Sequence, residues 1–516
     1  MKKSFKLLII LLLALLAFVA VGSKALTDSA EMVTVEERAS FGDKAEAKGL
    51  RINIPVRSNM GYRGLGRSYL RWDTDFVLDG AVKTQVTLSI QNNGVSDFAS
   101  YLDSGIYIST DVDADTYTLD AEEEMPNGLD AVYQEIASDT KVKSPWQRLV
   151  CFNDYYDKYP LLVELYIDGQ RYVSEFGYWA GAEGADDGIV SIGKSIDMNL
   201  QPEYLYTAQV SARKDAKGKI LAYHCTTYRA SAGVFSASDV TDTDIYYGAD
   251  VRSLDGGRPK EIIGDGYGIW RIGYALAESK VEEQVTKAIW FTESEPKLIW
   301  PMEKDDILLD IVISEDQQEL LLFTGVDGMC VLTVIDVETL QELQRLELME
   351  YEVSSEYMPE ISHVFRTENA VVPLLTEGKL AVVSKAETGE YTLEFVLDKD
   401  LDRQEEAITY IEEKHGEKTT LWNRKPATIE MDWHDGKLAM VYALTNDHGS
   451  GRGGYLNEQP CAFWVAVYDQ SGMIYGGEYY LSQGVGEYCD HGNKISEIQV
   501  DVRMGIHWSE GGEEAE

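Results

Sequence analysis

The chain has 516 residues, of which 44% are apolar and 26% are charged, a composition typical of a folded globular protein. Its 88 acidic and 46 basic residues give a formal charge of -42 at pH 7. This balance argues against a nucleic-acid partner, because phosphate binding depends on clustered Lys and Arg, and against docking of the folded part on an anionic membrane.

The first 25 residues have the pattern of an export signal. Lys2, Lys3 and Lys6 precede an unbroken apolar run from Leu7 to Val21, and small residues stand at Ser23 and Ala25, the -3 and -1 positions of a cleavage site. This order of segments is typical of a secretory signal peptide, and the apolar run is shorter than the roughly 20 residues of a spanning helix. An uncleaved N-terminal anchor helix is the alternative. Both interpretations predict a protein that is secreted or held at the outer face of the cytoplasmic membrane by this segment alone.

Most of the remaining chain has the pattern of β-strands. Residues 26–49 are polar and lack apolar periodicity, which predicts a linker. From residue 50 to about 510, short runs rich in Val, Ile, Tyr, Trp, Phe and Thr alternate with Gly, Asp and Asn clusters. Residues 400–415 carry the best helical stripe and are expected to lie in a loop, and residues 511–516 form an acidic tail. The predicted fold class is therefore all-β.

An acidic segment has the ligand spacing of a calcium loop. Asp111, Asp113, Asp115 and Glu122 stand at positions 1, 3, 5 and 12, as in the EF-hand. However, Thr116 occupies the position where the sharp turn takes Gly, and the preceding residues have a strand pattern instead of a helical one. These four residues are the predicted metal site and Ca²⁺ the one predicted cofactor, with a solvated acidic hairpin turn as the competing interpretation.

The other chemically active residue types do not form a recognisable catalytic pattern. His224 is adjacent to Cys225, but neighbouring residues on a strand point to opposite faces and cannot easily chelate one metal. The glycine-rich residues 61–67 are not followed by the helix that a phosphate-binding loop requires. With 88 acids, no pair of carboxylates can be singled out as an acid and base, so catalytic residues stay unassigned.

Three segments repeat one design, a polar turn followed by an apolar run: residues 310–324, 374–384 and 433–443. Their turn acids, Asp316, Glu377 and Asp435, are spaced by 61 and 58 residues. This pattern predicts a tight turn that joins two strands, the second of which is buried on both faces. Weaker copies occur at residues 168–173 and 216–221.

The repeat resembles the blade pattern of bacterial TolB-like and YVTN-type β-propellers over residues 305–480. Ser314 and Asp316 precede a buried run, and a later strand ends in Asp336 followed by Thr339; Gln317 stands where those families have Gly. The resemblance implies a propeller over residues 50–510, and the repeat spacing implies about seven or eight four-stranded blades. Tandem β-sandwich domains are the alternative.

These observations lead to an expected function. Propellers bind ligands through loops that converge at one face or in the central channel, so we expect an extracytoplasmic binding or scaffolding module that recognises a protein, peptide or cell-wall glycan. The alternative is an extracellular hydrolase or lyase acting on glycans, which would need carboxylates gathered in a pocket.

Overall fold

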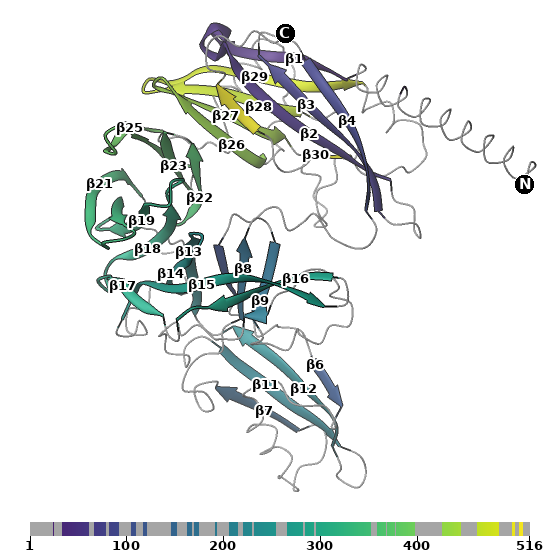
Figure 1. Ribbon diagram of the computed structural model, residues 1–516, viewed down its shortest axis with the longest axis vertical. Helices are drawn as coiled ribbons and strands as arrows, with labels where there is room; N and C mark the ends of the chain where they lie inside the picture. Colours follow the sequence, from purple (N-terminus) through teal and green to yellow (C-terminus); the bar gives the residue numbers. More distant parts are fainter. Residues whose placement is uncertain are drawn as a thin grey trace, which may run out of the picture. The chain divides into compact units, whose positions relative to one another are not determined.

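The computed structural model describes residue 24 and residues 33–60, 67–78, 82–91, 105–109, 117–120, 146–151, 162–167, 170–174, 191–192, 206–214, 220–229, 232–253, 266–281, 284–293, 296–351, 359–367, 369–376, 378–397, 426–444, 462–483, 498–500 and 505–508. The chain forms two compact units, residues 1–95 with 363–516 (unit 1) and residues 96–362 (unit 2). In both units the described residues are almost all in strands, which confirms the all-β prediction, and these strands make seven sheets (Figure 1).

Unit 1 contains three of these sheets. The first has the order β1-β29-β28-β27-β26, formed by β1 (Val33–Gly42), β26 (Pro426–His434), β27 (Lys437–Leu444), β28 (Ala462–Asp469) and β29 (Gly472–Gln483). The second has the order β30-β2-β3-β4, with β31 also on β2, formed by β2 (Leu50–Met60), β3 (Arg67–Val77), β4 (Val82–Gln91), β30 (Ile498–Val500) and β31 (Gly505–Trp508). The third, which begins two residues before the boundary of the unit, is β22 (Ile361–Thr367), β23 (Ala370–Leu375), β24 (Leu380–Lys385) and β25 (Tyr391–Leu397).

Unit 2 contains the other four sheets. Two of them are β10-β9-β8-β5 and β6-β12-β11-β7, formed by β5 (Gly105–Ser109), β6 (Tyr117–Asp120), β7 (Trp146–Cys151), β8 (Leu162–Ile167), β9 (Gln170–Ser174), β10 (Ser191–Ile192), β11 (Tyr206–Lys214) and β12 (Ile220–Arg229). The third is β13 (Ala232–Val240), β14 (Asp244–Ser253), β15 (Gly268–Val281) and β16 (Gln284–Phe291), with β17 (Lys297–Pro301) on β15. The fourth is β18 (Ile307–Ile313), β19 (Glu319–Val326), β20 (Met329–Asp336) and β21 (Glu342–Glu350).

The predicted hairpins are confirmed at each repeat. The polar turns join β18 to β19, β23 to β24 and β26 to β27 as antiparallel pairs. The weaker copies join β8 to β9 and β11 to β12. In β19 every residue from Glu319 to Gly325 is buried, which is the two-sided burial that the apolar runs predicted.

The linker prediction for residues 26–49 is wrong over most of its length. Val33–Gly42 form strand β1, which pairs along its length with β29, and Lys44–Ala47 form the short 3-10 helix η1. The alternation that marks a strand is hidden in the sequence because a bulge shifts the register between Glu37 and Ala39 and because the strand lies at the edge of its sheet. Only contact with a partner some 440 residues later makes this segment a strand.

The first and last strands of the described residues complete sheets of unit 1. Strand β1 adds the outermost strand to the sheet of β26–β29, and the last strands, β30 and β31, pair with β2. Ile506 of β31 is buried in the core beside Ile52 and Ile54. The first and last described strands are therefore held inside the fold by partners that are distant in sequence.

The core of unit 1 lies between sheets packed face to face, and strand β28 shows this most directly. Phe463, Val465 and Val467 pack in one cluster with residues of β2 and β3, whereas Trp464 and Tyr468 pack in another with residues of β23 and β24. Because successive side chains on a strand point to opposite faces, the sheet of β26–β29 is covered on both sides. Each fully buried large apolar side chain contributes about 1.5–3 kcal/mol to stability.

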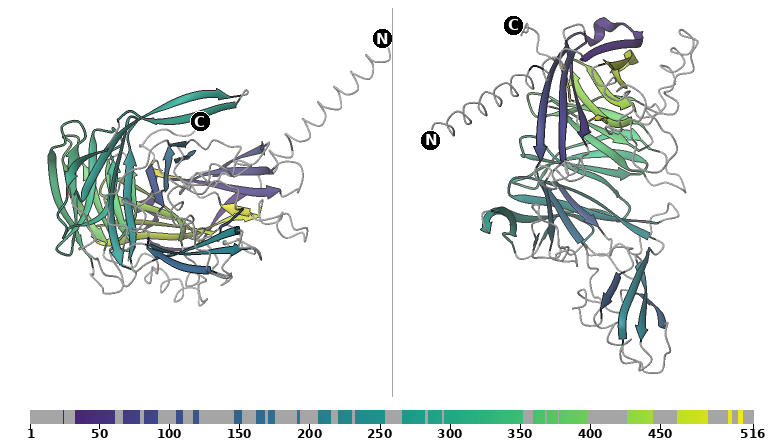
Figure 2. Two further views of the ribbon diagram at one scale, coloured as in Figure 1. Left: turned by 90° about the horizontal axis from the view of Figure 1, so that it is seen from below. Right: turned by 90° about the vertical axis from the view of Figure 1, so that its right-hand side faces the viewer.

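Unit 2 has a comparable core between its third and fourth sheets. Tyr246 and Ile269 pack with Leu308, Ile311 and other apolar residues of β18–β20. Beyond this packed part, residues 274–281 of β15 pair only with residues 284–291 of β16 among the described strands. The two strands continue as a long twisted ribbon, drawn in teal in Figure 2.

Several predicted segments lie outside the described residues. These are the leader apart from Lys24, the helical stripe at residues 400–415 and the acidic tail at residues 511–516. In the described part of the chain, no helix combines the length and apolar character required to cross a membrane.

Candidate functional site

The predicted calcium ligands Asp111, Asp113, Asp115 and Glu122 also lie outside the described residues. Strand β6 begins at Tyr117, directly after the acidic run. Within the described ranges, no three His, Cys, Asp or Glu side chains come together in a way that could hold a metal ion. The calcium loop therefore stays a prediction.

The histidines and cysteines that the structure describes occupy strands and turns. His224 and Cys225 are adjacent in β12, opposite Thr118 and Tyr117 of β6. His434 ends β26 with its ring stacked on Trp508 of β31, so it packs against the C-terminal strand.

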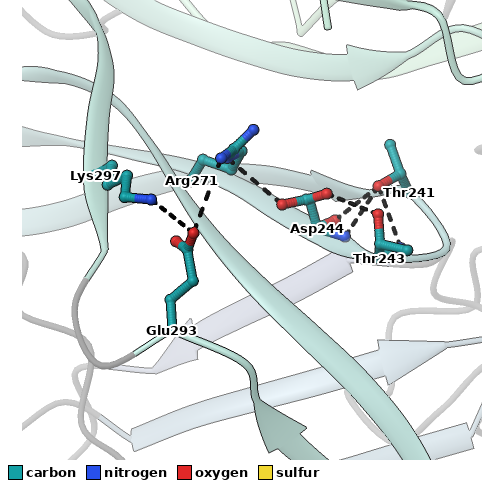
Figure 3. Close-up of polar contacts among 6 residues, drawn as sticks. All are labelled: Thr241, Thr243, Asp244, Arg271, Glu293 and Lys297. Atoms are coloured by element: carbon teal, nitrogen blue, oxygen red, sulfur yellow. Dashed lines mark hydrogen bonds and ion pairs between the residues drawn. The ribbon is translucent and has the colours of Figure 1, made fainter. Parts of the chain in front are cut away.

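The candidate functional site is a row of charged side chains across the third sheet of unit 2 (Figure 3). The register places Tyr246 of β14 opposite Arg271 of β15, and Arg271 opposite Lys297 of β17. Asp244 lies two residues before Tyr246 on β14, on the same face of the sheet, and is opposite Gly273. Residues directly opposite each other in a sheet share a face, so the sheet brings together groups that are up to 53 residues apart in sequence.

Arg271 lies at the centre of the row between two carboxylates. Its Nε is 3.5 Å from Asp244 Oδ1 and its Nη2 is 4.0 Å from Glu293 Oε1. Glu293 Oε1 also accepts a hydrogen bond of 2.7 Å from Lys297 Nζ. The exposed fractions of the Asp244, Arg271 and Glu293 side chains are 23%, 25% and 27%, whereas that of Lys297 is 60%. The row thus alternates acceptor, donor, acceptor, donor, and its formal charges cancel.

The electrostatics of the row follow from these contacts. The hydrogen bond from Lys297, with the charges of Lys297 and Arg271, holds the pKa of Glu293 below its ordinary value. Burial, with the charge of Asp244, raises the pKa of Tyr246 to about 12, although Arg271 opposes the shift. At neutral pH Glu293 is therefore ionised and the Tyr246 phenol is neutral.

A tight turn at residues 241–243 fixes the Asp244 end of the row. Thr241 Oγ1 accepts a hydrogen bond of 3.0 Å from Asp244 N, and Thr243 Oγ1 donates one of 2.7 Å to Asp244 Oδ2. Tyr274 of β15 donates to the turn from its hydroxyl, which lies 2.7 Å from Thr241 O. Hydroxyl groups of this kind replace backbone partners in short turns, so the Asp244 carboxylate is held in one position.

The fourth sheet of unit 2 supports the same turn. Gln317, in the turn between β18 and β19, accepts a hydrogen bond of 2.9 Å from Asp242 N and donates one of 3.2 Å to Asp242 Oδ1. Deeper in the sheet, Asp239 Oδ2 accepts a hydrogen bond of 2.7 Å from Ile313 N of β18. Asp239 is 5% exposed, so this charge-assisted bond is shielded from water. The two sheets are therefore joined at the end that carries the row.

Part of the hydrogen-bonding capacity of the row is not used within the described residues. Arg271 Nε is a buried atom that makes no hydrogen bond there, and the Tyr246 hydroxyl lies against Arg271. Tyr246 as a whole is 0% exposed. Buried polar groups of this kind usually have a partner, in the protein or in ordered water or a ligand.

Sequence reasoning did not identify this row. Its members are ordinary charged residues in a chain with 88 acids. The registers of β14, β15 and β17 bring Asp244, Arg271 and Lys297 together, and Glu293 joins them just after β16, where Thr292 N donates to Gly273 O of β15. The closest sequence signal is the Thr-Asp-Thr-Asp run at residues 241–244, which has the residue types of a side-chain-capped turn.

Comparison with known proteins does not place the chain in a family. No protein-family model and no curated protein sequence matches it. Among solved structures, the chain is similar to the periplasmic gluconolactonase of Pseudomonas aeruginosa, with 10% identity, a TM-score of 0.29 and coverage of 88% of this chain and 100% of that chain. It is also similar to a putative 6-phosphogluconolactonase from Bacteroides uniformis, with 9% identity, a TM-score of 0.27 and coverage of 88% and 99%.

A third similar structure is the Cps50 (Swd1) β-propeller domain of Myceliophteria thermophila, with 11% identity, a TM-score of 0.23 and coverage of 62% of this chain and 93% of that chain. All three TM-scores are below 0.5. Similarity at this level supports no conclusion about the fold, activity or ligand of this protein.

Proposed function

We propose that the protein is an extracytoplasmic binding module, built as a β-propeller of seven blades, that recognises a protein, peptide or cell-wall glycan. The proposed blades are the seven sheets of the described residues. Support for this architecture comes from unit 1, where a sheet covered on both faces is packed between two others and where the first and last described strands complete sheets. Radially repeated sheets bury their faces against neighbours in this way.

The observation that carries the binding role is the row of Asp244, Arg271, Glu293 and Lys297. Three of its four side chains are half-buried, and its turn is fixed by hydrogen bonds from two sheets. Polar groups held on rigid elements with unused hydrogen-bonding capacity are typical of sites that orient a ligand. The N-terminal pattern of Lys residues and an apolar run supports a position outside the cytoplasm.

Two measurements test this proposal together. Protease added to intact cells that express the full chain should digest the folded body, and the purified protein should bind isolated cell walls or a surface protein without releasing product from them. A protein that is protected inside intact cells would contradict the export proposal. Release of soluble sugar from the cell walls would contradict the binding role and favour the hydrolase or lyase alternative.

A further inference from the structure

We propose that the row centred on Arg271 binds a neutral saccharide, an inference that rests on the proposed binding function and names its ligand class. A sugar hydroxyl donates one hydrogen bond and accepts others. Neighbouring hydroxyls on a sugar ring can therefore donate to Asp244 or Glu293 and accept from Arg271 or Lys297. The row alternates acceptors (Asp244 and Glu293) with donors (Arg271 and Lys297), which is the alternation that neighbouring sugar hydroxyls require.

The two positive and two negative side chains of the row disfavour ligands that carry a net charge. A ligand anion that approaches Arg271 meets the carboxylates of Asp244 and Glu293, whose oxygens lie 3.5 and 4.0 Å from the guanidinium nitrogens. A ligand cation meets Arg271 and Lys297. Because the four formal charges cancel, a ligand without net charge is the class that gains hydrogen bonds to both signs and loses nothing to repulsion.

The hydrogen-bonding capacity that a ligand needs is present. The contacts of Arg271 with both carboxylates are longer than the 2.7–2.9 Å of a strong charge-assisted hydrogen bond, so its N–H groups are only loosely engaged. Lys297 has three N–H donors, is 60% exposed, and directs one donor at Glu293.

The scaffold keeps these groups in place before a ligand arrives. Tyr274 and Gln317 hold the turn at residues 241–243 from two directions, and Asp239 joins β13 to β18 beneath it. A site that is already ordered loses little conformational entropy on binding, which matters for saccharides because each hydroxyl exchanges a bond to water for one to protein.

The test is calorimetric titration of the purified full-length chain with maltotetraose, cellotetraose and chitotetraose, and with tetragalacturonate and tetralysine as charged comparators. At least one neutral tetrasaccharide should bind. Arg271→Met and Glu293→Gln should each raise its Kd about tenfold or more, because each removes hydrogen bonds to a charged group.

Arg51→Met is the matched control. Arg51 has a comparable ion pair, 3.7 Å from its Nε to Asp75 Oδ2, and its Nε also makes no hydrogen bond within the described residues, but it lies on β2 of unit 1. This variant should bind the saccharide like the unmodified protein. If Arg271→Met does not fold, Lys297→Ala changes the exposed member of the row and Thr243→Ala removes the exposed hydroxyl that donates to Asp244. Each should weaken binding without loss of the folded state.

Three outcomes would overturn the proposal. Binding of tetragalacturonate or tetralysine without any neutral tetrasaccharide would show an ionic site. Saccharide binding that is unchanged in Arg271→Met, Glu293→Gln and Lys297→Ala would show that the ligand binds elsewhere. Absence of binding to all three neutral oligomers would remove the saccharide assignment, whereas the binding function itself fails only if the protein also binds neither cell walls nor a surface protein.

Discussion

At the scale of single residues, Gln317 shows how a strained position is used. Its φ of 57° lies in the left-handed region, which favours glycine, and it stands where the blade pattern of the resembling families has Gly. This conformation costs about 1 kcal/mol in a residue with a Cβ. In return, its side-chain amide makes two hydrogen bonds to Asp242 of the neighbouring sheet. The side chain is thus kept for a contact between sheets that glycine cannot make.

Two substitutions of Gln317 separate these effects. Gln317→Ala keeps the backbone strain and loses both hydrogen bonds, so the free energy of unfolding of this variant should be about 1 kcal/mol lower than that of the parent. Gln317→Gly loses the same bonds but relieves the strain, so it should be more stable than Gln317→Ala by about 1 kcal/mol. Urea unfolding of the three proteins measures this order. An alanine variant as stable as the parent would show that the amide contact contributes nothing.

Glu37 links the N-terminal strand to a buried tyrosine pair. The hydroxyls of Tyr475 and Tyr479 are hydrogen-bonded to each other, and Tyr479 Oη donates to Glu37 Oε2 at 3.4 Å. Lys44 Nζ lies 2.8 Å from the same carboxylate oxygen. Burial alone would raise the pKa of Glu37, but the hydrogen bonds from Lys44, Ser40 and Tyr479 and the charge of Lys44 outweigh it and lower the pKa.

The lowered pKa of Glu37 predicts a loss of stability in acid. A carboxyl group with a folded-state pKa below its ordinary value of 4.5 stabilises the fold above that pH, and this contribution disappears as the pH falls through the folded-state pKa. Glu37→Gln should therefore reduce the pH dependence of the unfolding free energy in this acidic range. If the parent and the variant lose stability in parallel below pH 4.5, the carboxylate of Glu37 contributes nothing.

At the scale of elements, the hairpins are set by local turn chemistry. Asp435 and Gly436, which join β26 to β27, have φ values of 47° and 79°. Two successive left-handed residues make the turn whose twist matches that of paired strands, and Asp-Gly is one of the favoured dipeptides. The sequence Trp-His-Asp-Gly-Lys therefore predicts this hairpin without reference to the rest of the chain.

The Asp435–Gly436 turn offers a test free of packing effects. A Cβ added at Gly436 meets nothing within 4 Å, so Gly436→Ala tests only the backbone conformation. It should lower the unfolding free energy by about 1 kcal/mol, and Asp435→Asn should have little effect because Asn also tolerates the left-handed region. Chemical denaturation measures both. A neutral Gly436→Ala would mean that the turn changes its conformation at little cost.

At the scale of the whole molecule, pairing of the first and last described strands with distant partners closes unit 1. Residues 1–95 and 363–516 belong to one unit because β1 pairs with β29 and because β30 and β31 pair with β2. Asp432 of β26 reinforces this closure, since its Oδ2 accepts a hydrogen bond of 2.8 Å from Trp508 N of β31.

Removal of residues 501–516 should destabilise unit 1 selectively. The truncation removes β31 with buried Ile506 and exposes one edge of β2, whereas all sheets of unit 2 keep their strands. Hydrogen exchange should become faster in β2 and β26 and stay unchanged in β18–β20. Asp432→Ala removes the acceptor of the Trp508 N–H and should lower the free energy of unfolding by about 1–3 kcal/mol. Hydrogen exchange in β2 and β26 should become faster in this variant too, but less than in the truncated protein. If hydrogen exchange became equally faster in both units, the pairing of β31 with β2 would not act on unit 1 alone.

The sequence by itself determined the all-β class, the repeated hairpins and the apolar runs of β19, β24 and β27, because turn residues and strand patterns act over a few neighbours. Only the tertiary structure decided that residues 33–42 are a strand, since their partner is β29 and their alternation is broken by a bulge. It also decided which of 88 acids adjoin Arg271, because the register between strands brings Asp244 and Lys297 to it and the chain just after β16 brings Glu293, whatever their spacing in the sequence.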